Sequence, residues 1–226
     1  MKFKSLIDSP YLQDAEKGLV TVLPYSGMQG FSYTLFFGIL SILLSFGKGI
    51  IFYLPGLLLL FNAKVRERIN FRFETSPGWI IFGLLLIAVY AKWWAWYGGN
   101  YWGPRFFLVF TFPASLALAV FINNTIKRKL MLLSGISVII LSFWVGIDGY
   151  VFGQLLMDQC WQNNYALESL CWYAPEYSAL WRPFVTGEIY KILSYERAPF
   201  AIWQVLVLSY LVITTMLNYR KRPTLV

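Results

Sequence analysis

The stretch LMLLSGISVIILSFWVGIDGYVF, residues 130–152, contains a single charged side chain, Asp148. A helix needs about 20 mainly apolar residues to cross the hydrocarbon region of a bilayer, so this stretch is long enough to cross. Further apolar runs lie at residues 31–46, 50–63, 79–97, 106–122 and 200–219. We therefore expect an all-α polytopic membrane protein.

The composition supports a membrane protein and argues against several other classes. The chain is 58% hydrophobic and only 13% charged, which is not the balance of a soluble domain. The net charge of +8 comes from short basic clusters beside apolar runs, so we expect membrane lipids and not nucleic acid as the partner. With no His and two Cys, we expect neither a metal site nor thiol redox chemistry.

Basic residues cluster at three places beside the apolar runs, and these clusters predict the topology. They are Lys64, Arg66, Arg68 and Arg72; Lys127, Arg128 and Lys129; and Arg220, Lys221 and Arg222. The positive-inside rule places all three in the cytoplasm. We expect five transmembrane helices from Ile50 onward in the plasma (inner) membrane, with the C-terminus cytoplasmic and residues 98–104 and 154–199 outside.

Residues 31–46 form a short run, and two placements remain open for it. The run crosses the membrane with its N-terminus inside, or it lies in the external interface and re-enters at Gly47. The predicted organisation is an N-terminal external or interfacial segment at 1–30 and transmembrane helices with GKG and GGNYWGPR external turns at 31–153. A folded external loop follows at 154–198, and the last helix with its basic tail occupies 199–226.

The predicted external loop contains both cysteines, Cys160 and Cys171. If the topology is right, they lie in an oxidising compartment, and the ten intervening residues can close into a disulfide loop. The other alternative is two buried free thiols. The residues alone leave both alternatives open.

Three separated cations fall at one predicted depth in the membrane. Lys48 lies in the FGKGI turn, Lys92 near the external end of the 79–97 run, and Arg105 directly after GGNYWGP. Lys and Arg side chains at helix ends commonly reach toward headgroups, and this is the structural alternative. However, Gly47 and Gly49 would let the backbone approach an anion, and the first turn of a helix favours one at Arg105. A phosphate at the membrane surface suits this arrangement.

Two segments carry a family resemblance. SILLSFGKGIIFYLPGLLLL and YAKWWAWYGGNYWGPRFFLVFTFP resemble paired segments in the later half of bacterial integral-membrane glycosyltransferases of the GT-C superfamily. These are similar to protein O-mannosyltransferases and aminoarabinose transferases that use a polyprenyl-phosphate-linked sugar. The resemblance covers roughly residues 31–113, through the spacing of Lys48, Pro55, Trp96, Gly98, Gly99, Gly103, Pro104 and Arg105.

The resemblance implies a lipid-linked sugar donor as substrate, without a cofactor, and transfer of a hexosyl or pentosyl group on the external face. It implies that Lys48 and Arg105, with Lys92, bind the phosphate of the donor. It also implies aromatic side chains that line the entrance for the sugar or lipid, namely Tyr53, Trp94, Trp96 and Trp102.

No catalytic residue is assigned. The family's catalytic acids lie in a first external loop after a spanning helix, and residues 1–30 contain no acidic pair in that context. Asp148 is better explained as a polar residue near the interface. We expect a C-terminal portion, as a fragment or split subunit, that is inactive without an N-terminal half or partner membrane subunit. The alternative is a non-catalytic membrane module or accessory subunit. A small transporter is disfavoured because the charges lie at the edges of the runs.

Overall fold

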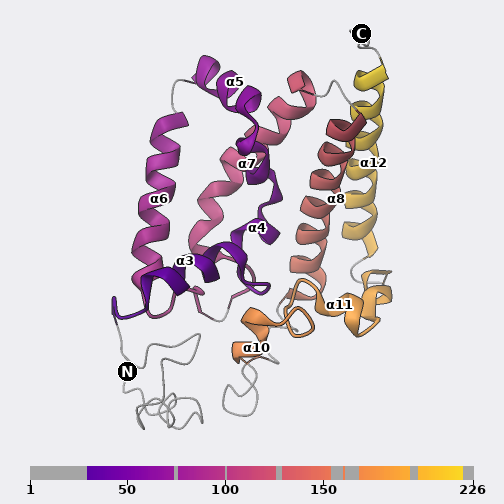
Figure 1. The fold of residues 1–226 in the computed structure, drawn as a ribbon. Coiled ribbons are helices and arrows are strands. Elements are labelled where there is room, and N and C mark those ends of the chain that lie inside the picture. Colours follow the sequence, from indigo (N-terminus) through magenta and orange to yellow (C-terminus); the bar gives the residue numbers. More distant parts are fainter. Residues whose placement is uncertain are drawn as a thin grey trace. The chain divides into compact units, whose positions relative to one another are not determined.

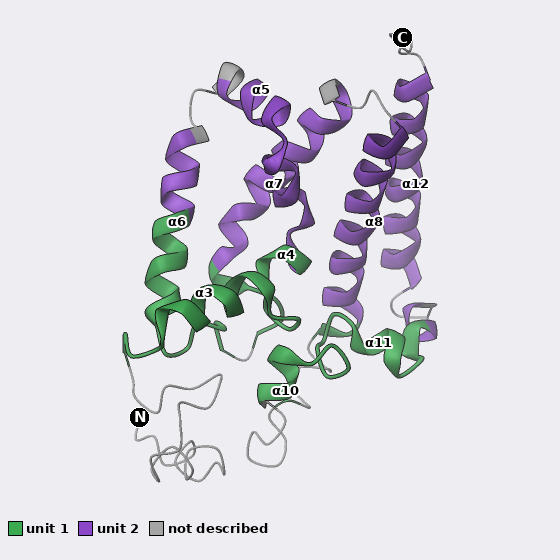
Figure 2. Cartoon of the chain, viewed as in Figure 1, with its two compact units in different colours: residues 1–52, 84–106, 152–189 green, residues 53–83, 107–151, 190–226 purple. Residues whose placement is uncertain are grey.

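The structure, a computed structural model, describes residues 30–73, 76–99, 101–125, 129–153, 160, 168–193 and 198–220. These residues form helices, turns and connecting segments and no β-strand (Figure 1). The predicted segment 1–30, apart from its last residue, and most of residues 154–167 lie outside them. The chain divides into two compact units (Figure 2). Unit 1 is Met1–Phe52, Leu84–Phe106 and Phe152–Ile189, and unit 2 is Tyr53–Gly83, Phe107–Val151 and Tyr190–Val226.

Among the residues that the structure describes, three helical segments are long and apolar enough to cross a membrane. They are Arg105–Asn123, Lys129–Val151 (α8) and Ala198–Arg220 (α12). The first combines a 3-10 helix, η2 (Arg105–Phe110), with α7 (Thr111–Val120) and the start of a π-helix, η3 (Phe121–Thr125). The protein is therefore an all-helical, multi-pass membrane protein.

The exposed surface of α12 is apolar, as expected for a helix surrounded by lipid. Its exposed side chains include Ile202, Trp203, Val205, Leu206, Tyr210, Ile213, Met216 and Leu217. A contiguous apolar surface of this kind is rare on a soluble monomer. Within unit 2, α12 packs against α8, with the rings of Tyr150 and Phe200 centred 4.2 Å apart.

The apolar run at residues 50–63 differs from the single transmembrane helix expected for it. It forms a short helix, α4 (Ile50–Tyr53), followed by a 3-10 helix, η1 (Pro55–Phe61). Pro55 explains the break, because proline lacks an amide hydrogen and disfavours helical geometry in the preceding residue. In η1, Gly56 packs so closely on α7 that an added Cβ would lie 2.6 Å from the carbonyl oxygen of Ala114.

The first basic cluster lies on an amphipathic helix, α5 (Ala63–Phe73), in unit 2. Val65 and Ile69 are one turn apart and buried in a core with residues of η1, α7 and α8, whereas Lys64, Arg66 and Arg68 are exposed. The side-chain oxygen of Asn62 accepts a hydrogen bond from the Lys64 amide at 3.0 Å. The core of unit 2 comprises Leu59, Val65, Ile69, Ala117, Val120, Phe121, Leu132 and Val138.

Unit 1 contains the short helices and turns that the sequence associates with function. It holds α3 (Leu35–Leu44), the end of α6 (Ser76–Lys92), the 93–106 segment, α10 (Glu168–Tyr173) and α11 (Arg182–Val185). The apolar run at 79–97 is helical only to Lys92. Beyond it the chain turns, and the Trp94 amide donates to the Gly30 carbonyl at 2.9 Å.

Candidate functional site

The GKG turn joins α3 to α4 and lies against α10. The Gly47 amide donates a hydrogen bond to the Trp172 carbonyl at 3.1 Å. A Cβ added to Gly47 would lie inside van der Waals distance of the Cys171 carbonyl oxygen, so a side chain does not fit. We had expected this glycine to let the backbone approach an anion, whereas the group that approaches it here is the backbone of α10.

Lys48 connects the GKG turn to the GGNYWGPR turn. Its side chain is 2% exposed, and its Nζ donates hydrogen bonds to the carbonyls of Gly99, at 3.2 Å, and of Tyr101. These acceptors are 51 and 53 residues away in the chain. Lys48 therefore holds together the two segments that carried the family resemblance.

The GGNYWGPR turn presents its carbonyls through an unusual backbone conformation. Gly98, Gly99 and Gly103 have φ angles of +79°, +77° and +70°. Residues with a Cβ rarely adopt this left-handed region, so the glycines are required for the turn itself. These φ angles explain why three glycines precede Arg105 so closely.

Trp172 covers the amine of Lys48. The Nζ lies 4.8 Å from the centre of the Trp172 ring, within the range of a cation–π interaction. The same ring stacks on Tyr97, with centroids 5.3 Å apart. The amine is thus enclosed between two carbonyl oxygens and an aromatic face.

This enclosure lowers the pKa of Lys48 to about 7. The main cause is burial, which disfavours the charged amine, and the positive charge of Arg105 adds to it. Lys48 and Arg105 therefore lie close enough for their charges to interact.

Arg105 is exposed, in contrast to Lys48. The central carbon of its guanidinium lies 4.4 Å from the centre of the Tyr101 ring and 5.8 Å from that of Phe106. Within the described part of the chain, the guanidinium makes these ring contacts and no hydrogen bond. A guanidinium stacked on a ring keeps its N–H groups in its own plane, where they can bind an anion.

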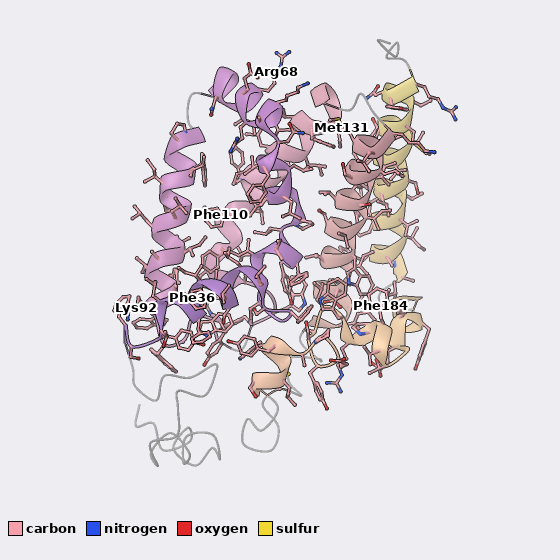
Figure 3. The ribbon with its side chains drawn as sticks, in the orientation of Figure 1. Phe36, Arg68, Lys92, Phe110, Met131 and Phe184 are labelled. Carbon is pink, nitrogen blue, oxygen red and sulfur yellow. A yellow bond between two sulfur atoms is a disulfide. The ribbon has the colours of Figure 1, made fainter. Side chains whose placement is uncertain are left out.

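The other predicted site residues lie in different surroundings. Lys92 is exposed at the end of α6, and its carbonyl accepts a hydrogen bond from the Tyr33 amide at 3.1 Å (Figure 3). Trp94 and Trp102 are half-buried in unit 1, where Trp102 packs on Gly153. Tyr53 is buried and belongs to unit 2, whereas Lys48 belongs to unit 1.

Trp96 lies in an aromatic cluster and does not line a surface in this structure. Its side chain is 2% exposed, and its ring is centred 6.4 Å from Tyr33, 5.9 Å from Tyr97 and 6.1 Å from Tyr173. Tyr173 in turn shares a hydrogen bond of 2.7 Å between its hydroxyl and that of Ser41. The cluster joins α3, the 93–106 segment and α10.

A disulfide joins Cys160 to Cys171, with Cα atoms 6.1 Å apart. The sequence left open a disulfide or two buried free thiols, and the structure contains the disulfide. Cys171 directly precedes Trp172, so the disulfide anchors the residues that cover Lys48. A second attachment follows at Ser178, whose hydroxyl donates to the Phe46 carbonyl at 2.8 Å.

Trp172, Tyr173 and Ser178 were not recognised as site residues from the sequence. Their one local signal is that Trp172 and Tyr173 follow Cys171. Their contacts with α3 and with the GKG turn join residues more than a hundred positions apart, and no local pattern encodes such a pairing.

Asp148 is fully buried in α8 and lies close enough to Tyr53 for an electrostatic interaction. Both residues belong to unit 2. Asp148 thus does not face water in this structure.

Comparison of the chain with protein-family models, with curated proteins and with solved structures gave no match.

Proposed function

We propose that this chain is the membrane portion of a glycosyltransferase that binds a polyprenyl-phosphate-linked sugar at the external face of the plasma (inner) membrane. In the proposed topology, α4–η1, α6, Arg105–Asn123, α8 and α12 make five crossings. The three basic clusters and the C-terminus are cytoplasmic, in keeping with the positive-inside rule. Unit 1 then receives the lipid-linked donor from the outer leaflet.

The observation that carries this proposal is the link from Lys48 to the Gly99 and Tyr101 carbonyls. It holds the turn that ends at Arg105, and Tyr101 supports the exposed guanidinium on its ring. A guanidinium supported in this way loses little side-chain entropy when it binds an anion. Its paired N–H donors match the oxygens of a phosphate, which makes phosphate a suitable ligand.

The two cations have different roles in this proposal. Arg105 is the phosphate-binding residue because its guanidinium is exposed. Lys48 is a positioning residue, since its amine is already bound to carbonyls. Lys92 is a peripheral cation at the end of α6.

The chemistry of transfer explains why a cation is needed at this position. An acceptor hydroxyl forms a bond to the anomeric carbon of the sugar, while the bond from that carbon to the phosphate oxygen breaks. The hydroxyl proton passes to a base, and polyprenyl phosphate leaves with one more negative charge than it carried in the donor. Arg105 would stabilise that developing charge.

A non-catalytic lipid-phosphate-binding module or accessory subunit is the second candidate. The contacts described around Lys48 and Arg105 are with carbonyl oxygens and aromatic rings. A carboxylate that would activate an acceptor hydroxyl is not among them. Both candidates share donor binding and differ in whether sugar is transferred.

Binding and transfer should be measured separately on the full chain in liposomes. Undecaprenyl-phosphate-linked mannose is a suitable binding probe, and a radiolabelled form of it reports transfer. We expect Arg105→Ala to weaken binding about tenfold to a hundredfold, as expected for loss of a charge-assisted bond. Lys92→Ala, which removes an exposed cation of the same turn region, is the matched control and should have a smaller effect.

Unchanged binding in Arg105→Ala would refute the phosphate site. Binding without transfer by the chain alone favours a module or a portion that needs a partner. Transfer by the chain alone would show that the base lies within these 226 residues.

A further inference from the structure

Helix α3 has an inverted amphipathic pattern. The residues on its buried face are small or polar, namely Gly38 and Ser41, together with Ile42. Its exposed face carries large apolar side chains, including Phe36, Leu40 and Leu44, which are 65%, 38% and 50% exposed. A helix in water has the opposite distribution, so the surroundings of the exposed face must themselves be apolar.

The N-terminal part of α3 is attached to the end of α6. The Tyr33 amide donates to the Lys92 carbonyl at 3.1 Å. Gly38 lies so close to the Ala91 carbonyl that an added Cβ would overlap with it. Figure 2 shows α3 running across the end of α6 within unit 1, and Figure 3 marks Phe36 and Lys92 there.

The C-terminal part of α3 is attached to α10. The hydroxyls of Ser41 and Tyr173 are 2.7 Å apart, and the Gly47 amide just after the helix donates to the Trp172 carbonyl. Trp172 contacts Lys48 and Tyr97, which places it at the turn that follows α6. Both parts of α3 are therefore attached near the end of α6, one to α6 itself and the other to α10 beside the turn that follows α6.

The length of α3 agrees with these attachments. Its 10 residues span roughly 15 Å, about half of the hydrocarbon thickness of a bilayer. No charged residue occurs between residue 30 and Lys48, and the amine of Lys48 is buried. A helix of this kind can neither cross the bilayer nor present a charged surface to water.

We infer that α3 lies in the plane of the membrane, in the leaflet where α6 ends, and that Phe36, Phe37, Leu40 and Leu44 contact the acyl chains of that leaflet. In unit 1 the exposed Leu84, Leu85 and Val89 of α6 continue this apolar surface toward the bilayer interior. Gly30 and Gly47 then lie on the same side of the membrane. This placement is independent of the proposed glycosyl transfer.

Site-directed spin labelling measures this placement directly. A single cysteine is introduced in the full chain as Phe36→Cys, Leu40→Cys or Leu44→Cys, while the native cysteines remain in their disulfide. Nitroxide collision rates with oxygen, which concentrates in hydrocarbon, and with a water-soluble nickel chelate give the depth of each label in liposomes. Each labelled protein is used only if its Tm equals that of the unlabelled protein.

We expect the same shallow hydrocarbon depth for all three labels. On α8, Leu133→Cys and Ile140→Cys are the matched controls, because both side chains are exposed and the helix is long enough to cross. The depths of these two labels must differ by roughly 10 Å, because an α-helix rises that far over seven residues.

Three results would overturn the inference. A graded depth along α3, or a label at Leu40 deeper than those at Phe36 and Leu44, would show that the helix inserts across the bilayer. High collision with nickel would show that its apolar face is in water. Low collision with both reagents would show that another helix or a second copy of the chain covers it.

Discussion

Lys48 and Trp172 form a cation–π pair in which the amine lies 4.8 Å from the ring centre. This pair joins the GKG turn to the disulfide-anchored helix α10, and the hydrogen bonds of Lys48 extend the connection to the GGNYWGPR turn. The amine is therefore the point at which three segments of unit 1 meet.

Removal of the Trp172 ring should weaken the contacts among these three segments and destabilise the protein. We expect Trp172→Ala to lower the free energy of unfolding by about 3–5 kcal/mol, since the ring is fully buried and stacks on Tyr97. Trp172→Phe keeps an aromatic face and should recover more than half of that loss. Thermal unfolding in detergent micelles measures both variants, and equal losses would argue against a specific role for the ring.

The lowered pKa of Lys48 predicts a dependence of stability on pH. The native amine has a pKa of about 7, whereas the amine of the unfolded chain keeps the ordinary value of about 10.4. Between these values the unfolded chain binds a proton that the native protein lacks. The contribution of Lys48 to the free energy of unfolding should therefore rise with pH from about 7 to about 10 and be constant below 7.

This pH dependence is measured as a difference between variants, because other groups titrate in the same range. Lys48→Met removes the amine, so the change in stability between pH 6 and pH 9 should be smaller than in the natural sequence. Lys92→Met removes an exposed amine and should leave the change as it is. The same slope in all three proteins would contradict the burial of a titrating amine at Lys48.

Gly47 should not tolerate a side chain, although alanine is normally the mildest replacement. A Cβ at this position would overlap with the Cys171 carbonyl, so Gly47→Ala must displace α10 or the GKG turn. We expect a loss of about 1–3 kcal/mol, in the range found for overpacking. Gly146→Ala is the matched control because its Cβ would meet no atom within 4 Å, and it should be neutral or slightly stabilising.

The disulfide should contribute to stability and limit the access of reagents to Lys48. Replacement of both cysteines by serine is expected to lower the free energy of unfolding by about 3 kcal/mol, as is typical of a loop of this length. It should also increase the rate at which an amine-specific reagent modifies Lys48, as measured by peptide mass spectrometry. An unchanged rate would mean that the other contacts of α10 are sufficient to hold Trp172 in place.

The long helices could be predicted from the sequence, whereas the contacts of the short ones could not. The runs at 106–122, 130–152 and 200–219 are confirmed as helices long enough to cross a membrane. In a bilayer every backbone polar group needs a hydrogen bond within its own helix, and this requirement acts on each run separately. The break after Tyr53 had a local signal in Pro55, but the run was still expected to be one helix. The mean hydropathy of a run does not show where a proline breaks the helix.

The structure brings some of the predicted site residues together and separates others. Lys48 and Arg105 belong to one unit and interact electrostatically, whereas their common depth in the membrane stays a prediction. Tyr53 belongs to the other unit, because the boundary between the units falls between Phe52 and Tyr53, at the end of α4. Trp172 was missed because its pairing with Lys48 depends on the tertiary fold of a distant segment.

The carbonyls of Gly99 and Tyr101 have a further consequence when they are regarded as a coordination shell. Two carbonyl oxygens with an aromatic ring beside them form a site for a small amine, and the side chain of Lys48 is such an amine attached to the chain. The turn therefore requires the amine group and not its covalent attachment to the backbone. In Lys48→Ala, propylammonium replaces the deleted atoms and should restore the lost Tm, whereas 1-propanol, of similar size and without charge, should not.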